Sequence, residues 1–128
     1  MKLLLDTHLL LWAAGEPERL PTAARAMIEE RANQLVFSAA SLWEIAIKHT
    51  LGRSDFRVEP ALLRRGLLDN GYMEQAVTGR HAVVVAGLPP RHKDPFDRML
   101  LAQATAEGML LLTANPALAG YAGPIQLF

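Results

Sequence analysis

The chain has 128 residues, 51% of them hydrophobic, which is enough to build the core of one domain of ordinary size. It contains no cysteine, which excludes disulfides and thiolate metal sites and fits a reducing compartment. The 13 basic and 13 acidic side chains cancel, which excludes a general electrostatic attraction to nucleic acid; any such contact needs local basic residues, a bound metal or a second subunit.

The apolar N-terminus resembles a signal peptide only superficially. Asp6 and His8 divide it into runs that are too short for a secretory segment, and no stretch approaches the length of a membrane span. We therefore expect a soluble, cytoplasmic and unprocessed protein that does not contact the membrane.

Short apolar runs alternate with amphipathic segments along the whole chain. Buried strands are predicted at 3–5, 35–37, 75–77, 109–112 and 125–127. Helices are predicted at 8–14, 21–31, from Ser38 or Ser41 to about 51, 61–68, 80–86 and 95–107, with a helical turn at 116–121. This alternation predicts a single α/β domain, residues 1–128, with a mostly parallel sheet of four to five strands between helices.

In such sheets ligands bind beyond the carboxyl ends of the strands, so acids at those positions are candidate site residues. Asp6 directly follows the first strand, although capping of the next helix, shared with Thr7, explains it equally well. Asp94 and Asp97 flank Pro95 at the start of a later helix, where capping and the helix dipole explain acids locally. Asp97, however, also leads an inward apolar line.

Glu44 has two explanations. It stands three residues after Ser41, which is the spacing of a capping box and requires no chemistry. It also belongs to a helical stripe with Ala40, Ile47 and Leu51, which are residue types that face a core. A carboxylate in such a stripe is costly unless a partner or a cation offsets its charge.

Together the acids form a pattern that local explanations do not cover. Three separate segments bring carboxylates to the same edge of the predicted sheet, where they would repel one another unless a hard divalent cation binds between them. No cluster of histidines or cysteines suggests zinc. The sequence therefore predicts a magnesium site, which suits phosphodiester hydrolysis.

Four segments then resemble PIN domains, most closely the VapC-like toxin branch. They are LLDTH at 4–8, SAASLWEIAIK at 38–48, HKDPFDR at 92–98 and LLTAN at 111–115. The resemblance covers essentially the whole chain in order. It implies a three-layer α/β/α fold, an endoribonuclease that depends on Mg²⁺ or Mn²⁺, a small antitoxin partner of the VapB type and a homodimer.

The resemblance also assigns residues. Asp6, Glu44 and Asp97 match the metal site, and Asp94 matches an additional acid; Asp6 and Asp97 would bind the cation directly, while Glu44 or Asp94 would bind it or orient the attacking water. Cleavage of this type leaves a 5′-phosphate and a 3′-hydroxyl. Asn115 stands where many relatives have an acid, which puts a second metal in doubt.

Several neighbours are candidate supporting residues. Hydroxyls of Thr7 and Ser38 could orient a ligand or water, and Asn115 could coordinate through its carbonyl. Trp12 and Trp43 are expected in the core or at a subunit interface. Five basic residues lie in or near the site segments and could contact RNA phosphate, although a solvated surface explains them equally well. They are Lys48, Arg91, His92, Lys93 and Arg98.

Two other functions compete with this one. The first is a PIN fold retained as a binding module with weakened catalysis, for which Asn115 would be the sign. The second is a phosphoryl-handling domain, either a response receiver or a phosphatase. The receiver's expected acids and lysine are missing, position 8 is His where a phosphatase of the aspartyl-phosphate type needs Asp, and no P-loop motif occurs.

Overall fold

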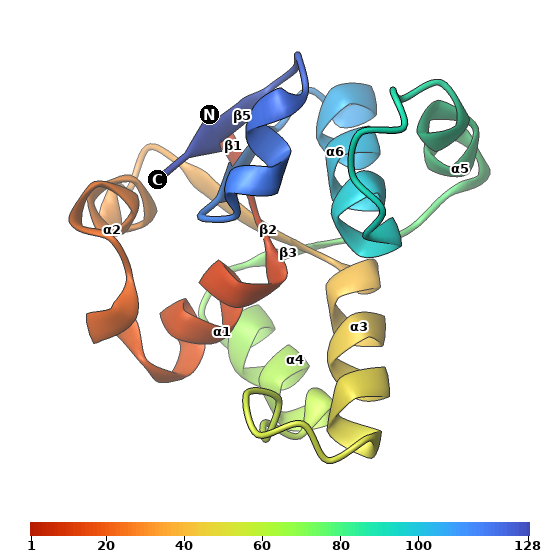
Figure 1. The fold of residues 1–128 in the computed structure, drawn as a ribbon. Helices are drawn as coiled ribbons and strands as arrows, with labels where there is room; N and C mark the ends of the chain where they lie inside the picture. Colours follow the sequence, from red (N-terminus) through yellow and green to blue (C-terminus); the bar gives the residue numbers. More distant parts are fainter.

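The computed structural model describes all 128 residues, which form one parallel sheet of five strands in the order β3-β2-β1-β4-β5 (Figure 1). The strands are β1 (Lys2–Leu5), β2 (Gln34–Ser38), β3 (Met73–Gln75), β4 (Leu110–Thr113) and β5 (Ile125–Leu127). The helices are α1 (Thr7–Gly15), α2 (Thr22–Glu29), α3 (Ala39–Thr50), α4 (Pro60–Asp69), α5 (Gly79–Ala86) and α6 (Pro95–Glu107), with 3₁₀ turns η1 (Pro17–Arg19) and η2 (Pro116–Gly120).

The central strand β1 has both of its faces covered. Leu3, Leu4 and Leu5 are fully buried, as expected for an apolar run in the middle of a parallel sheet. Leu3 and Leu5 pack into one cluster with residues of α1, α3 and α4. Leu4 packs into a second cluster with residues of α6 and η2. The predicted three-layer α/β/α fold is therefore confirmed.

The helices divide between the two faces accordingly. In Figure 1, α1, α3 and α4 lie below the sheet, whereas α6 lies on its other side and α5 packs on the outside of α6. The chain leaves α6 through Gly108, whose φ of 67° is readily adopted only by glycine. None of the helices combines the length and apolar character that crossing a membrane requires.

Some predicted boundaries were wrong. The third strand is Met73–Gln75 and not 75–77, and α2 ends at Glu29, two residues before the predicted Arg31. The first helix starts at Thr7 because Asp6 caps it. The short, mostly exposed β3 carries too little apolar alternation to fix its position from sequence.

The predicted inward stripe of α3 was right for Ala40 and Glu44 and wrong for Ile47 and Leu51. Ser38, and not Ser41, is the N-cap, and Ser41 lies inside the helix without making a capping box. The buried face of α3 runs through Ala40, Ser41, Glu44 and Ile45, while Ile47 and Leu51 are 39% and 72% exposed. Glu44 is buried as expected, and Ser41 and Ile45 take the inward positions predicted for Ile47 and Leu51.

Candidate functional site

Asp6 serves both as a helix cap and as a residue of the sheet edge. Its Oδ1 accepts a hydrogen bond from the backbone N–H of Leu9 at 2.8 Å, which fixes the first turn of α1. Its Oδ2 accepts from Oγ1 of Thr113 at 2.5 Å, at the end of the neighbouring strand β4. Asp6 therefore caps α1, as one of the two explanations from the sequence expects, and its second oxygen ties it to the neighbouring strand.

Glu44 comes to the same edge from the second turn of α3. Its Oε1 accepts from Oγ1 of Thr7 at 2.6 Å, and its Oε2 lies 2.6 Å from Nζ of Lys48. Oγ1 of Thr7 is also 3.1 Å from Oγ of Ser41. The carboxylate is only 4% exposed and has an ammonium as its single charged partner.

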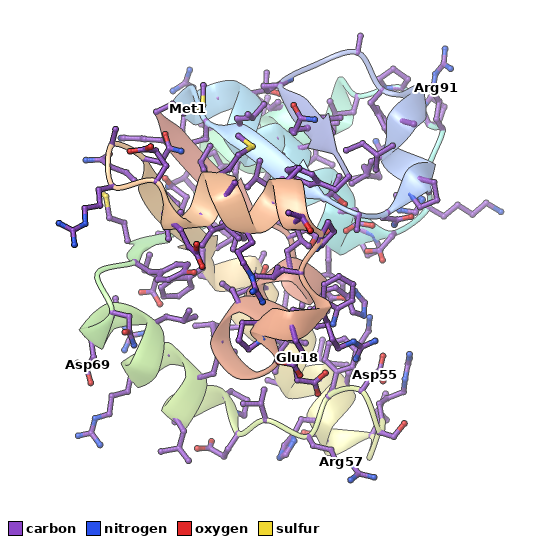
Figure 2. All side chains as sticks on the ribbon, turned by 90° about the vertical axis from the view of Figure 1, so that its left-hand side faces the viewer. Met1, Glu18, Asp55, Arg57, Asp69 and Arg91 are labelled. Carbon is purple, nitrogen blue, oxygen red and sulfur yellow. The ribbon has the colours of Figure 1, made fainter.

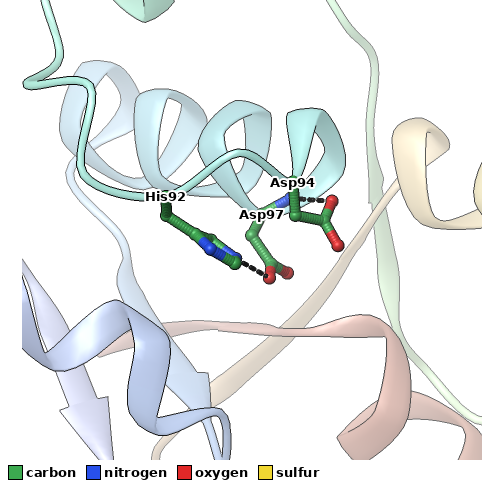
Figure 3. Close-up of side chains that lie close together, drawn as sticks. All are labelled: His92, Asp94 and Asp97. Atoms are coloured by element: carbon green, nitrogen blue, oxygen red, sulfur yellow. Dashed lines mark hydrogen bonds and ion pairs between the residues drawn. The ribbon is translucent and has the colours of Figure 1, made fainter.

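Asp97 reaches the site from the first turn of α6. Its Oδ2 accepts from Nε2 of His92 at 2.8 Å and from Nδ2 of Asn115 at 3.1 Å. Asp94 is the N-cap of α6, and its Oδ1 accepts from the backbone N–H groups of Phe96 and Asp97. Figure 3 shows the His92 imidazole directed at the Asp97 carboxylate, with Asp94 beside it; one potential ligand atom from each lies within 4.8 Å of the others.

The charges of these acids act on one another. Burial is the main cause of a raised pKa at Asp6, and the charge of Asp97 raises that pKa further. Burial also raises the pKa of Asp97, with further contributions from Asp94 and Glu44, while the hydrogen bond from His92 opposes them. The structure thus brings the acids of three separate segments into one site.

The chemistry of these donors suits a hard divalent cation, although only His92, Asp94 and Asp97 bring ligand atoms within 4.8 Å of one another, and Asp6 and Glu44 lie outside that group. Asp6, Glu44 and Asp97 are 5%, 4% and 9% exposed, so their negative charges are largely removed from water. Lys48 offsets only one of them. Buried carboxylates with excess negative charge and oxygen donors are what Mg²⁺ or Mn²⁺ stabilises in proteins. The nearest histidine, His92, is hydrogen-bonded to Asp97, and no cysteine is present, so the site offers oxygen ligands.

The supporting residues have specific structural partners. Oγ of Ser38 accepts from the N–H of Ala40 at 3.0 Å, so this hydroxyl caps α3. Asn115 caps η2, since its Oδ1 accepts from the N–H of Ala117 at 3.0 Å while its Nδ2 faces Asp97. The amide carbonyl of Asn115 is therefore directed away from the acids, contrary to the expectation that it would coordinate a cation.

The basic residues predicted to contact RNA differ in their surroundings. Lys48 pairs with Glu44, and its Nζ also lies 4.8 Å from the centroid of the Phe56 ring. The Arg98 guanidinium donates to the carbonyls of Val85, Leu88 and Pro89 and to the Tyr121 hydroxyl, which favours a structural role. Arg91 and Lys93 are exposed and remain available for phosphate.

Sequence reasoning missed the role of Thr113 and the donors at Asp97. Thr113 lies in the quoted LLTAN segment, and its hydroxyl at the end of a strand beside Asp6 was a usable signal.

Trp43 is 64% exposed and packs edge-on against Phe96 at a centroid distance of 5.4 Å, so it is not in the core. Trp12 is half-buried and packs against the main hydrophobic cluster.

A cleft next to α1 does not include the acids. It has a volume of about 1050 Å³ and lies between α1, η1, α4 and the loop that joins α3 to α4. Figure 2 views the molecule from this side, with Asp55 and Arg57 at the tip of that loop. Most of its lining is apolar, including Leu11, Trp12, Leu62 and Leu67, and His8 lines it on the side that follows Asp6 and Thr7 in the chain.

This fold is that of a PIN domain. The PIN domain family model matches residues 3–124, so the chain belongs to the PIN domain family. It is 31% identical over 122 residues to Ribonuclease VapC22 of Mycobacterium tuberculosis (strain ATCC 25618 / H37Rv), a match that spans 94% of this chain and 92% of the relative. The resemblance drawn from the sequence is thereby confirmed.

Solved structures share the fold over nearly the full length. VapBC2 from Rickettsia felis, bound to a DNA fragment from its promoter, has a TM-score of 0.72 at 14% identity, covering 100% of this chain and 99% of that one. Mycobacterium tuberculosis VapC20, described as a toxin that cleaves the sarcin-ricin loop, has a TM-score of 0.61 at 15% identity, covering 94% and 96%. At these identities the likeness shows the fold.

Proposed function

We propose that this protein is a Mg²⁺- or Mn²⁺-dependent endoribonuclease and the toxin of a VapBC-type toxin–antitoxin pair. One observation carries the proposal: Asp6, Glu44 and Asp97 are buried together at the carboxyl edge of the parallel sheet, with Lys48 offsetting only one charge. Membership of the PIN family and the likeness to Ribonuclease VapC22 support it.

The residues divide the work as follows. Asp6 and Asp97 would hold the cation, and Glu44, held by Thr7 and Lys48, would bind it or a water next to it. When bound, the cation supplies a Lewis acid that polarises the phosphate and lowers the pKa of water. RNA backbone would then approach this edge of the sheet, near the exposed Lys93.

Hydrolysis needs a proton acceptor for the attacking water. Asp94 uses Oδ1 to cap α6, which leaves Oδ2 to accept a hydrogen bond from that water and then its proton. The water oxygen forms the new bond to phosphorus and the bond from phosphorus to the 3′-oxygen breaks. The 3′-oxygen takes up a proton, giving a 3′-hydroxyl and a 5′-phosphate.

The test is RNA cleavage in Mg²⁺ or Mn²⁺ against a chelator. We expect Asp6→Asn to reduce cleavage to the level of the chelated protein while the fold is retained. The matched control is Asp69→Asn, because Asp69 lies on the surface of α4 and points outward in Figure 2. Cleavage by purified Asp6→Asn at the rate of the unmodified protein would refute the assignment.

A binding module with weakened catalysis is the alternative, and one observation favours it. Asn115 places a donor, and not an acid, against Asp97. A protein that binds Mn²⁺ and RNA but cleaves no RNA would support this alternative. Cleavage abolished by chelator and by Asp6→Asn would exclude it.

The cleft next to α1 is our proposed docking site for the antitoxin. Its lining is largely apolar, Leu62 on its wall is 65% exposed, and related structures are VapBC complexes. We expect Leu62→Glu to abolish the inhibition of cleavage by the proposed VapB-type antitoxin. Leu68→Glu is the control, since Leu68 lies on the same helix but outside the cleft; equal inhibition of both variants would exclude this docking site.

A second copy of the chain is our proposed occupant of the outer face of α3. Trp43, Ile47 and Leu51 are spaced four residues apart and are 64%, 39% and 72% exposed, so they form one apolar stripe. We expect a dimer in analytical ultracentrifugation that Leu51→Asp converts to monomer. A monomer in the unmodified protein, or an undisturbed dimer in the variant, would remove the stripe as the interface.

A further inference from the structure

Two donors converge on a single oxygen of Asp97. Nε2 of His92 lies 2.8 Å from Oδ2, and Nδ2 of Asn115 lies 3.1 Å from the same atom. A carboxylate oxygen that accepts two hydrogen bonds is fixed in position, and its charge is partly offset. Oδ1 has no such partner, so the carboxylate is held with one oxygen engaged and the other free (Figure 3).

The orientation of the Asn115 amide is determined by its other contact. Oδ1 of Asn115 accepts from the N–H of Ala117, and a rotated amide would place its oxygen against the Asp97 carboxylate and its NH₂ against an N–H. The backbone N–H of Asn115 also donates to Oγ1 of Thr113, whose hydroxyl donates to Asp6. The segment 113–115 therefore supplies one donor to each of the two acids.

His92 is held just as firmly from behind. Its backbone N–H donates to the Tyr121 hydroxyl at 3.1 Å, and that hydroxyl also accepts from Nη1 of Arg98 at 2.9 Å. Arg98 in turn binds the carbonyls that precede His92 in the chain, including those of Leu88 and Pro89. These bonds join the loop before α6 to Tyr121, which follows η2, and so hold the backbone that carries the imidazole.

The ring nitrogen nearest Asp97 acts as a hydrogen-bond donor. An ionised carboxylate can only accept, so at 2.8 Å from Oδ2 the Nε2 atom carries a proton. A protonated nitrogen does not bind a metal. The arrangement matches the way that residues behind a metal ligand fix its orientation, a contact whose loss lowers metal affinity about 10–100-fold.

We propose that His92 and Asn115 are positioning residues, which together hold Oδ2 of Asp97 and so leave Oδ1 as the oxygen offered to the divalent cation. This inference rests on the proposed function, since it assumes that Asp97 binds the cation. Asn115 then has a defined task as a donor, in the place where an acid would add a charge.

The experiment titrates Mn²⁺ into the full-length protein by calorimetry and follows the bound ion by electron paramagnetic resonance. We expect His92→Leu and Asn115→Leu each to weaken Mn²⁺ binding about 10–100-fold. His92→Gln should bind within a few-fold of the unmodified protein, because its side-chain amide carries a donor at a similar reach. His49→Leu is the control, since the His49 ring is hydrogen-bonded to the Phe56 carbonyl and to none of the acids, and the affinity for Mn²⁺ should not change.

Thermal unfolding in chelator separates folding from binding, and only folded variants are compared. If His92→Leu and Asn115→Leu bind Mn²⁺ as tightly as the unmodified protein does, the positioning role is overturned and the proposed function stands. If His92→Gln is as weak as His92→Leu, the donor role of His92 is overturned. If the unmodified protein binds no Mn²⁺, the failure lies in the proposed function and takes the inference with it.

Discussion

The hydroxyl of Thr7 donates a hydrogen bond to Oε1 of Glu44 at 2.6 Å, although the two residues are 37 positions apart in the chain. Thr7 begins α1 and Glu44 lies in α3, and both side chains are almost fully buried. The bond therefore joins two helices at the edge of the sheet where the acids meet. It also gives the Glu44 carboxylate, which is buried away from water, a hydrogen-bond donor from the protein.

Thr7→Val should remove this donor while keeping the shape of the side chain. Because the Glu44 carboxylate then stays buried with one partner fewer, we expect the free energy of unfolding to fall by about 1–3 kcal/mol. Thr7→Ser keeps the hydroxyl and should lose much less. Urea unfolding measures both, and equal stability of Thr7→Val and the unmodified protein would show that the bond contributes nothing.

Asp6→Asn should stabilise the protein in chelator at neutral pH. Burial raises the pKa of Asp6 above its usual 3.8, so the folded state holds the proton more tightly than the unfolded chain does. Stability from this group is fully present below the unfolded-state pKa and is lost as pH rises through the raised folded-state pKa. An asparagine carries no charge and should remove this loss.

The measurement is the free energy of unfolding in chelator from about pH 4 to about pH 8. The unmodified protein should lose stability across this range, and Asp6→Asn should lose less of it. Added Mn²⁺ should restore the unmodified protein and leave the variant unchanged. Parallel pH profiles for the two proteins would mean that Asp6 is not stabilised in its protonated form.

Much of the fold could be predicted because its signals are local. The apolar run at β1, the prolines that begin α4 and α6 and the glycine after α6 define elements without reference to the rest of the chain. The predictions failed where tertiary contacts decide. β3 is short and mostly exposed, and the sequence left the cap of α3 open between Ser38 and Ser41; the structure has Ser38, because the helix starts directly where β2 ends.

The candidate site divides in the same way. Asp6 and Asp97 could be singled out because they sit at the ends of predicted elements. The partners that hold them could not, since Thr113 is 107 positions from Asp6 and Asn115 is 18 from Asp97. Likewise, nothing in its local sequence indicates that Arg98 binds the carbonyls of a loop about ten residues earlier.

Lys48→Met should destabilise the protein in chelator and tighten its binding of Mn²⁺. The Lys48 ammonium is the charged partner of Glu44, so its loss leaves a buried carboxylate held only by Thr7. We expect the free energy of unfolding to fall by about 2 kcal/mol, less than for a fully buried pair because Lys48 is partly exposed. The site also becomes more negative, which favours a cation.

Thermal unfolding in chelator and calorimetric titration with Mn²⁺ check the two effects separately. Lys48→Arg keeps the positive charge and is the matched control, in which both effects should be small. A Lys48→Met protein that is as stable as the unmodified one would show that the charge of Glu44 is offset by other groups. Weaker Mn²⁺ binding in that variant would show that Lys48 supports the cation and does not compete with it.

Substitution of Arg98 should change the stability of the protein, whereas substitution of Lys93 should change its binding of RNA. Arg98 binds the carbonyl of Val85 in α5, two carbonyls of the following loop and the Tyr121 hydroxyl, so Arg98→Leu should lower the free energy of unfolding by about 2 kcal/mol. Lys93 is exposed, so Lys93→Met should change stability by less than about 0.5 kcal/mol. If Lys93 contacts phosphate, its loss should weaken RNA binding. The slope of the logarithm of the binding constant against the logarithm of the salt concentration should then become shallower by about 1. Urea unfolding and RNA binding across a salt series measure these effects, and an unchanged salt slope in Lys93→Met would place the RNA backbone elsewhere.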